Sequence, residues 1–195
     1  MLTDMLVRNR LSRRLLQIAG TRRTDDIVSE LLPHIPVGST VIDIGAGTCD
    51  VAARLIDHGR HVIPVDVRSV SCVDSLAPVL FDGHTLPFAD DSFEWALLVD
   101  VLHHTDPERL LCEAARVSSR IIVHEDIFTS RTQMLLTFAM DSITNLEFVG
   151  HPHSNKSDAG WRRLFRIHGL TVQHASQRDF WRAFTCATYV LRVHR

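Results

Sequence analysis

Acidic residues and glycines gather in one short segment of the chain, where they could bind a cationic ligand. Asp43 precedes Gly45 and Gly47, and Asp50 follows them. Two glycines this close allow a tight turn whose bare backbone a ligand can approach. The flanking carboxylates would repel a pyrophosphate and attract a positive charge. The segment therefore predicts a site for a small molecule that carries a cation.

The residues around this turn predict a strand, a helix and a second strand. Residues 40–44 and 61–66 are apolar runs that fit buried strands, and residues 49–58 fit a helix between them. This order is the nucleotide-binding half of a Rossmann-type sheet, in which ligands bind at the carboxyl ends of the strands. Asp66 ends the second strand, where an acid can accept both hydroxyls of a ribose. A nicotinamide cofactor is disfavoured, because the third glycine of G-x-G-x-x-G would fall at Asp50.

Several motifs together resemble those of a known family. The pattern Asp43-x-Gly45-x-Gly47-x-Cys49 is similar to motif I, (D/E)-x-G-x-G-x-G, of the class I S-adenosylmethionine (SAM) dependent methyltransferases, with Cys49 in place of the third glycine. Residues 81–95 resemble the D-A-x-x-L-P-F and S-F-D segments of the type 11 methyltransferases. The V-L-H-H-x-x-D-P and E-x-x-R-V segments of that family are matched by residues 99–107 and 113–117.

The resemblance implies an α/β fold with a Rossmann-like, doubly wound sheet. Its seven strands would run in the order 3-2-1-4-5-7-6, with strand 7 antiparallel and helices on both faces. Pro64 falls in an internal strand of that sheet, so we expect either a bulge there or an unpaired side. Ser157 and Gly169 are the expected caps of the last helix. The further strands are expected at residues 78–81, 95–99, 121–124, 170–175 and 187–193, and helices at 1–20, 25–32, 106–117 and 161–168.

The resemblance also implies SAM as the cofactor, S-adenosylhomocysteine (SAH) as the product, and contacts at the ends of the strands. Asp43 would orient the turn or the cofactor's amino group. Asp66 would hold the ribose hydroxyls, and Asp82 would accept from the adenine amino group. A backbone N–H of Gly83 or His84 would serve the adenine ring. The implied cofactor-binding residues are Asp43, Gly45, Ala46, Gly47, Asp66, Val67, Asp82, Gly83, His84, Asp100 and Val101.

A general base is needed only when the attacking atom of the acceptor carries a proton that must leave. The candidates by position are His103 and His104 after the fourth strand, Glu125 and Asp126 after the fifth strand, and His151 and His153 in the loop that comes later. His103 and His104 form a pair that the family carries irrespective of substrate, which favours a structural or cofactor-shaping role for them. Glu125 is likewise a candidate only through its position after the fifth strand. The candidate catalytic residues are His153, His151, His104 and Asp126.

The chain has 195 residues, of which 45% are hydrophobic, enough for one well-cored α/β domain. We expect a helical cap or lid at residues 1–36, whose arginines either face solvent or meet an anionic substrate or a membrane surface. Residues 37–195 would form the SAM-binding domain, with a substrate-side insertion at about residues 127–156. Apolar residues between positions 131 and 145, together with Phe180, Trp181 and Phe184, favour either a pocket for an apolar or aromatic acceptor or ordinary core packing.

Composition disfavours several other classes of protein. The formal net charge of −2 gives no reason to expect nucleic acid as a partner. The four cysteines are scattered, which disfavours a zinc site or disulfides and fits a reducing cytoplasm. No apolar run is long enough to cross a bilayer and no signal peptide is recognisable, so we expect a cytoplasmic protein, with a homodimer left open. Glu125, Asp126 and Asn145 are residue types that bind hard cations, but the rest of the magnesium-dependent pattern is missing, and we expect no metal.

The sequence thus favours an enzyme that moves a methyl group from SAM to a small acceptor by in-line displacement. The alternative is a catalytically inactive SAM- or SAH-binding regulatory or accessory protein. Decay of the pocket should have removed some of its key residues, whereas Asp43, Gly45, Gly47, Asp66 and Asp82 are all present.

Overall fold

A computed structural model describes residues 10–128, 155–180 and 184–194 of the chain. Its helices are α2 (Arg10–Leu31), α3 (Asp50–Asp57), the 3-10 turn η1 (Leu102–His104), α4 (Pro107–Val117) and α6 (Asp158–Ile167). Its strands are β1 (Thr40–Ile44), β2 (His61–Asp66), β3 (Val79–Leu80), β4 (Phe93–Val99), β5 (Ser118–Ile127), β6 (Leu170–Phe180) and β7 (Phe184–Val193).

The strands form a single sheet of seven strands in the order β3-β2-β1-β4-β5-β7-β6. β3, β2, β1, β4 and β5 pair in parallel, and β7 pairs antiparallel with both β5 and β6. The predicted fold and strand order are therefore confirmed. The carboxyl ends of the parallel strands meet at one edge, which is where ligands bind in this class of sheet.

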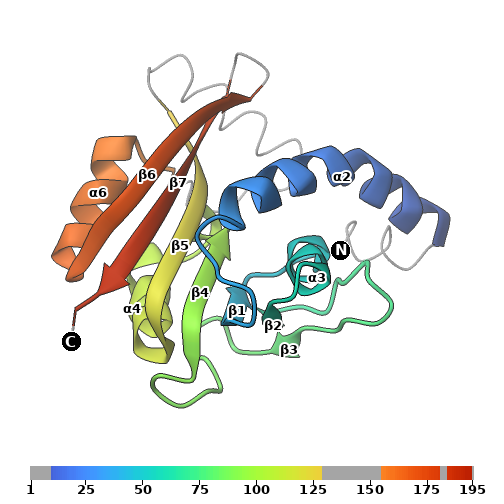
Figure 1. Cartoon of the computed structure of the whole chain (residues 1–195), viewed down its shortest axis with the longest axis horizontal. Coiled ribbons are helices and arrows are strands. Elements are labelled where there is room, and N and C mark those ends of the chain that lie inside the picture. The colour runs from blue at the N-terminus through green and yellow to red at the C-terminus, as the bar shows by residue number, and fades with distance from the viewer. Residues whose placement is uncertain (1–9, 129–154, 181–183, 195) are drawn as a thin grey trace.

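Helices cover both faces of the sheet, and each face has its own apolar core (Figure 1). On one face, α2 and α3 pack over β1 and β4 through Ile27, Leu31, Val41, Leu55 and Leu97. On the other face, α4 and α6 pack over β4, β5 and β7 through Leu111, Ile121, Trp161, Phe165 and Tyr189. Apolar residues that alternate along β5 thus serve both cores, which fixes the register of this central strand.

Local signals in the sequence explain where two helices begin and end. The side chain of Asp106 accepts hydrogen bonds from the backbone N–H groups of Glu108 and Arg109, and Pro107 occupies the first turn of α4. Ser157 caps α6 by accepting from the N–H of Gly160, as predicted. Gly169 follows α6 with a φ of +68°, the left-handed conformation that glycine adopts without strain.

Pro64 lies in β2 without a bulge, because the pairing of β1 with β2 runs unbroken from Thr40 to Ile44. Backbone groups alternate sides along a strand, and the carbonyl of Val65 faces β1. The nitrogen of Pro64 therefore faces β3, which pairs only with Val65 and Asp66. The second of the two expected solutions, a proline on an unpaired side, is the one found.

Several element boundaries differ from the sequence-based expectation, among them the start of β4 at Phe93, the end of β6 at Phe180 and the start of β7 at Phe184. We expected separate helices over residues 1–20 and 25–32, but α2 is one helix from Arg10 to Leu31. β5 was expected at residues 121–124 and extends over Ser118–Ile127, because β7 pairs with it along its length. Within the described parts of the chain, no helix is both long enough and apolar enough to cross a bilayer.

Candidate functional site

The glycine turn after β1 is held against β2 by its own backbone. The N–H groups of Gly45 and Ala46 both donate to the carbonyl of Val65, at 2.8 and 3.1 Å. Gly45 has a φ of +78°, and a Cβ on it would lie 2.4 Å from Cγ2 of Val101. Gly47 has a φ of +50°, and a Cβ on it would meet nothing within 4 Å. Gly45 is therefore required for packing, whereas Gly47 borders open space that a ligand could fill.

Cys49 adopts the conformation for which the motif normally supplies a third glycine. Its φ is 61° and its ψ is 13°, in the left-handed region. Its side chain is fully buried at the start of α3, and burial raises the pKa of the thiol to about 11. The substitution thus keeps the shape of the turn at the cost of backbone strain, on the order of 1 kcal/mol.

Asp66 at the end of β2 ties the two halves of the nucleotide-binding unit together. Its Oδ2 accepts from the N–H of Gly47 at 2.8 Å, and its Oδ1 accepts from the N–H of Arg68 at 2.9 Å. Each carboxylate oxygen has a second lone pair, so a ribose hydroxyl can be added to each. The residue lies where the sequence predicted it, beside the glycine turn.

Asp43 is almost completely buried beneath this turn. Its Oδ2 has no hydrogen-bond partner among the described residues. Burial, and then the neighbouring negative charge of Asp66, raise the pKa of Asp43 to about 7. A cation or an N–H donor placed near this oxygen would favour the ionised form.

Asp82, Gly83 and His84 form a turn beyond β3 that lies against the end of β2. Oδ1 of Asp82 accepts hydrogen bonds from the N–H groups of Thr85 and His84. These two bonds, that of Thr85 most, lower the pKa of Asp82. A Cβ on Gly83 would lie 3.2 Å from a methyl group of Val67, which is half exposed. The turn and Val67 thus border one another, while the N–H of His84 is already engaged by Asp82.

Asp100 follows β4 directly, and Asp126 lies near the end of β5. An arginine of α2 lies close to both carboxylates. Nη2 of Arg23 lies 2.7 Å from Oδ2 of Asp100 and 3.8 Å from Oδ1 of Asp126. Burial raises the pKa of Asp100, but the charge and hydrogen bond of Arg23, together with His124 and His103, outweigh burial, so the net shift is downward. Burial and the charge of Asp100 raise the pKa of Asp126. Asp100 has a φ of +50°, and its buried Oδ1 has no hydrogen-bond partner in the described residues.

The two residues after Asp100 are held by a buried carboxylate. Oε1 of Glu125 accepts from the N–H groups of Val101 and Leu102, at 2.9 and 2.6 Å. Its Oε2 lies 2.5 Å from Nδ1 of His103. Burial raises the pKa of Glu125, although His103 opposes this. Both side chains are buried and in hydrogen-bond contact, which fits a structural role for His103.

His104 lies against His103, with their ring centroids 3.9 Å apart, and is only partly buried. Among the predicted catalytic residues, His104 and Asp126 are thus near the cofactor edge. His151 and His153 lie outside the described residues, as do Asn145 and the predicted apolar helix at positions 131–145. The same holds for Trp181 and for the side chains of Phe180 and Phe184. In the described residues, no group of His, Cys, Asp and Glu side chains is arranged to hold a metal ion.

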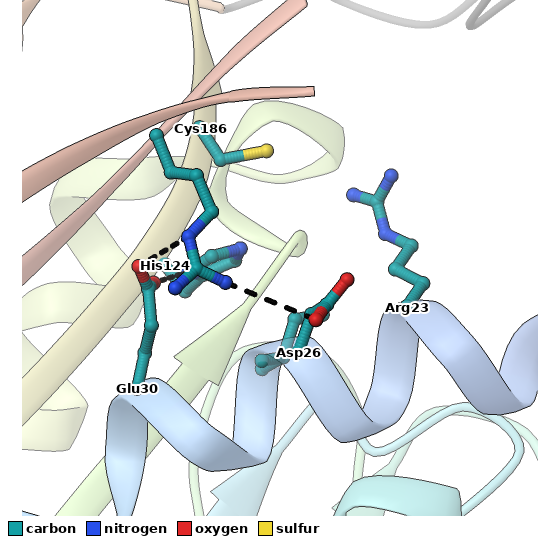
Figure 2. Close-up of a pocket in the computed structure, with 7 residues that line it drawn as sticks. Arg23, Asp26, Glu30, His124 and Cys186 are labelled. Carbon is teal, nitrogen blue, oxygen red and sulfur yellow. Dashed lines mark ion pairs between the residues drawn. The ribbon is translucent and has the colours of Figure 1, made fainter. Parts of the chain in front are cut away.

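A small cavity lies between α2 and the end of the sheet, next to the Arg23 ion pairs. Figure 2 shows Arg23, Asp26 and Glu30 on one side of α2, with His124 and Cys186 across from them on the sheet. The cavity is about 30 Å³, enough for one or two water molecules. Its remaining lining residues are Ile27 and Arg178.

His124 is part of a buried chain of hydrogen bonds at this cavity. The hydroxyl of Thr188 donates to Oε2 of Glu30 at 2.7 Å. Its oxygen lies 2.8 Å from Nδ1 of His124 and must accept from it, because the hydroxyl has only one proton. In the neutral imidazole, the other ring nitrogen, Nε2, then carries the lone pair. Neither His124 nor Arg23 was predicted as a site residue, since their partners lie on distant segments of the chain.

Part of the chain is similar in sequence to known proteins. Residues 42–120 match a family model described as a methyltransferase domain. An uncharacterized methyltransferase of Mycobacterium tuberculosis is 32% identical over 84 residues, which are 40% of this chain and 34% of that protein. The match thus spans about a third of that relative's length.

Solved structures share the fold over most of the chain. The magnesium protoporphyrin IX methyltransferase of Synechocystis, with bound SAH, has a TM-score of 0.65 at 16% identity, and the match covers 91% of this chain and 85% of that one. The geranyl diphosphate C-methyltransferase of Streptomyces coelicolor, in complex with Mg²⁺, geranyl diphosphate and SAH, has a TM-score of 0.70 at 11% identity, covering 89% and 80%. These similarities show that the chain has the fold of these methyltransferases, and that residues 42–120 are similar to a methyltransferase domain.

Proposed function

We propose that the protein binds SAM and transfers its methyl group to a small molecule. One observation carries this proposal: a bare glycine turn lies at the sheet edge near Asp43, Asp66 and Asp100. Asp43 and Asp100 each have a buried oxygen without a hydrogen-bond partner among the described residues. Buried polar atoms are nearly always hydrogen-bonded in native proteins. The unpartnered oxygens therefore suit a ligand that brings cationic or N–H donors.

The residues present fit the three parts of SAM. Its amino group and sulfonium would lie near the carboxylates of Asp43 and Asp100. Its ribose would share Asp66 with the N–H groups of Gly47 and Arg68. Its adenine would lie between the exposed side chain of Val67 and the turn of Asp82, which leaves Gly83 as the available backbone donor. Gly45, Ala46, Gly47 and Val101 complete the predicted contacts.

The cofactor supplies a methyl group on a positively charged sulfur, which is already activated for transfer. The protein's part is to align the acceptor with that group and to exclude water. Glu125 fixes the backbone of Val101 and Leu102, and so holds the loop that borders the methyl position. Arg23 covers Asp100 and Asp126 from α2. This contact supports the proposal that α2 is part of a lid over the domain at residues 37–195.

The acceptor is proposed to bind between α2, the end of β5 and the insertion at about residues 127–156. The cavity at Arg23 and His124 gives that region a charged lining, which favours an acceptor with a polar, proton-bearing group. An apolar or aromatic body for this acceptor stays a prediction from the sequence. Nε2 of His124 and the carboxylate of Asp126 are the described groups that could receive its proton. His151 and His153 remain candidates for the same task, with His104 nearer the cofactor.

The alternative remains a protein that binds SAM or SAH and does not transfer the methyl group. The retained carboxylates and the intact turn favour the enzyme, because a protein that only binds SAH needs no counter-charge for a sulfonium. A cytoplasmic setting and a homodimer remain predictions, as does the absence of nucleic acid and metal from the reaction.

Calorimetric titration of the full chain with SAM, SAH and NADH tests the cofactor. We expect heat with SAM and SAH and none with NADH. Heat with NADH alone would overturn the proposal. Incubation with methyl-labelled SAM and a panel of small phenols, carboxylic acids and amines then tests transfer, read as label in the acceptor. Tight binding of both sulfur ligands, with no label in any acceptor, would favour the binding protein instead.

A further inference from the structure

A second group of reactive side chains lies on the other face of the sheet, between α4 and α6. Glu108 and Cys112 are one turn apart on α4 and therefore lie on the same side of that helix. His168 follows α6 directly. Nδ1 of His168 is 3.4 Å from Sγ of Cys112, and its Nε2 is 3.8 Å from Oε2 of Glu108. A thiol, an imidazole and a carboxylate thus stand in a row.

The surroundings of the imidazole indicate which nitrogen carries the proton. Nε2 of His168 is buried and has no hydrogen-bond partner in the described residues, and Glu108 is the carboxylate closest to it. A proton on Nε2 is favoured by this negative charge. Nδ1 then presents its lone pair to the thiol and can accept the thiol proton. A nucleophile, a base and a group that orients the base are the parts of an activated thiol.

The other three cysteines differ from Cys112 in access. Cys49 and Cys72 are buried, and Cys186 donates to Oδ1 of Asp126 at 3.0 Å. Burial and the charge of Asp126 raise the pKa of the Cys186 thiol far above its ordinary value. Cys112 is exposed, and it has a base beside it. Reactivity of a cysteine requires both access and a means of forming the thiolate.

The geometry points to Cys112 as a site of reversible modification by small disulfides. His168 takes the proton from the thiol, and the thiolate sulfur attacks one sulfur of the disulfide. The S–S bond of the reagent breaks, a mixed disulfide forms at Cys112, and the second sulfur leaves as a thiolate that takes the proton from His168. Cys112 is oxidised and one half of the disulfide is reduced, so no further reactant is needed. A free thiol reverses the step.

The test uses the native full-length chain with oxidised glutathione and with an aromatic disulfide that releases a coloured thiolate. We expect one cysteine to react in a fast phase, and mass spectrometry of a digest to place the adduct on Cys112. Cys112→Ser should remove the fast phase. His168→Gln keeps the size of the side chain but cannot accept the proton, so it should slow the reaction roughly tenfold at neutral pH.

The pH profile separates a base from a packing residue. The wild-type rate should stay high at neutral pH, whereas the rate of His168→Gln should recover only in alkaline solution. Glu108→Gln, an exposed change that the helix tolerates, should slow the reaction about threefold and serves if His168→Gln fails to fold. A fast phase that survives Cys112→Ser, or wild-type rates in both Gln variants, would overturn the inference. None of these outcomes depends on SAM binding, which Cys112→Ser should leave unchanged.

Discussion

Nη2 of Arg23 lies 2.7 Å from the carboxylate of Asp100, across 77 residues of sequence, and joins α2 to the tip of β4. The same guanidinium is 3.8 Å from Asp126. One arginine thus compensates two carboxylates that burial and mutual repulsion would otherwise make costly. The contact places a fixed positive charge next to the position where we propose that a sulfonium binds.

Arg23→Gln should therefore destabilise the protein and change its preference between SAM and SAH. Leaving Asp100 and Asp126 without a counter-charge should cost about 1–2 kcal/mol of unfolding free energy, discounted because Arg23 is partly exposed. SAM carries one more positive charge than SAH, so removal of the guanidinium should favour SAM over SAH by roughly fivefold. Urea unfolding and calorimetry measure the two effects.

Arg22→Gln is the matched control, because Arg22 is exposed and its loss changes the net charge equally. It should leave both the stability and the ratio of the two affinities close to wild type. An equal shift in the two variants would mean that overall charge, and not the ion pair with Asp100, sets the preference.

Two glycines of the turn should separate stability from cofactor binding. Gly45→Ala would push a Cβ to 2.4 Å from Val101 at a φ of +78°, so we expect a loss of about 2–4 kcal/mol in unfolding free energy. Gly47→Ala meets nothing within 4 Å and should cost only about 1 kcal/mol of backbone strain. Its Cβ would enter the proposed ligand space, so SAM affinity should fall by at least about tenfold. Unfolding curves and SAM titrations of both variants measure these effects. Normal binding of SAM by Gly47→Ala would contradict the prediction.

Local patterns predicted the elements around the glycine turn well, because these elements depend on residues close in sequence. The order of the strands was implied by the resemblance to the type 11 methyltransferases. The strand, glycine turn and helix around Gly45, and the acid at Asp66, were all recognisable from spacing. Cys49 in the left-handed conformation confirms that the backbone follows the motif even where the third glycine is missing.

Contacts between distant segments could not be predicted in the same way. Arg23 was counted with neither expected helix, because it falls in the break between residues 1–20 and 25–32. Ile27, Val28 and Leu31 pack α2 onto the sheet, and this burial continues the helix through the break. The chain of hydrogen bonds from Glu30 through Thr188 to His124 joins three segments that have no shared local pattern.

Asp66→Asn should weaken the cofactor while keeping the turn. The amide retains one oxygen for a backbone N–H but replaces the other acceptor with a donor, so a ribose hydroxyl and one internal hydrogen bond are lost together. We expect SAM and SAH affinities to fall by roughly 1–3 kcal/mol each. Asp57→Asn, an exposed change at the end of α3, controls for the lost charge. Equal affinities in Asp66→Asn and Asp57→Asn would refute the role of Asp66 at the ribose.

Asp43 should make the stability of the free protein depend on pH. Its pKa is raised from an ordinary 3.8 to about 7, so the folded state keeps the proton that the unfolded state has already lost. This contribution is fully present below about pH 4 and disappears as pH rises to about 7, with an upper limit of about 4 kcal/mol. Asp43→Asn cannot ionise, so its unfolding free energy should lack this decline.

Urea unfolding of both proteins at about pH 5 and about pH 7.5 measures the difference. The wild type should lose stability relative to Asp43→Asn between the two values, because the other titrating groups are common to both. A cation bound near Asp43 favours the carboxylate, so SAM binding to the wild type at about pH 6.5 should also release a fraction of a proton, detected by calorimetry in buffers of different ionisation enthalpy. Parallel pH profiles for the two proteins would mean that the buried carboxyl titrates at its ordinary pH, and that the turn leaves it more open to water than its burial indicates.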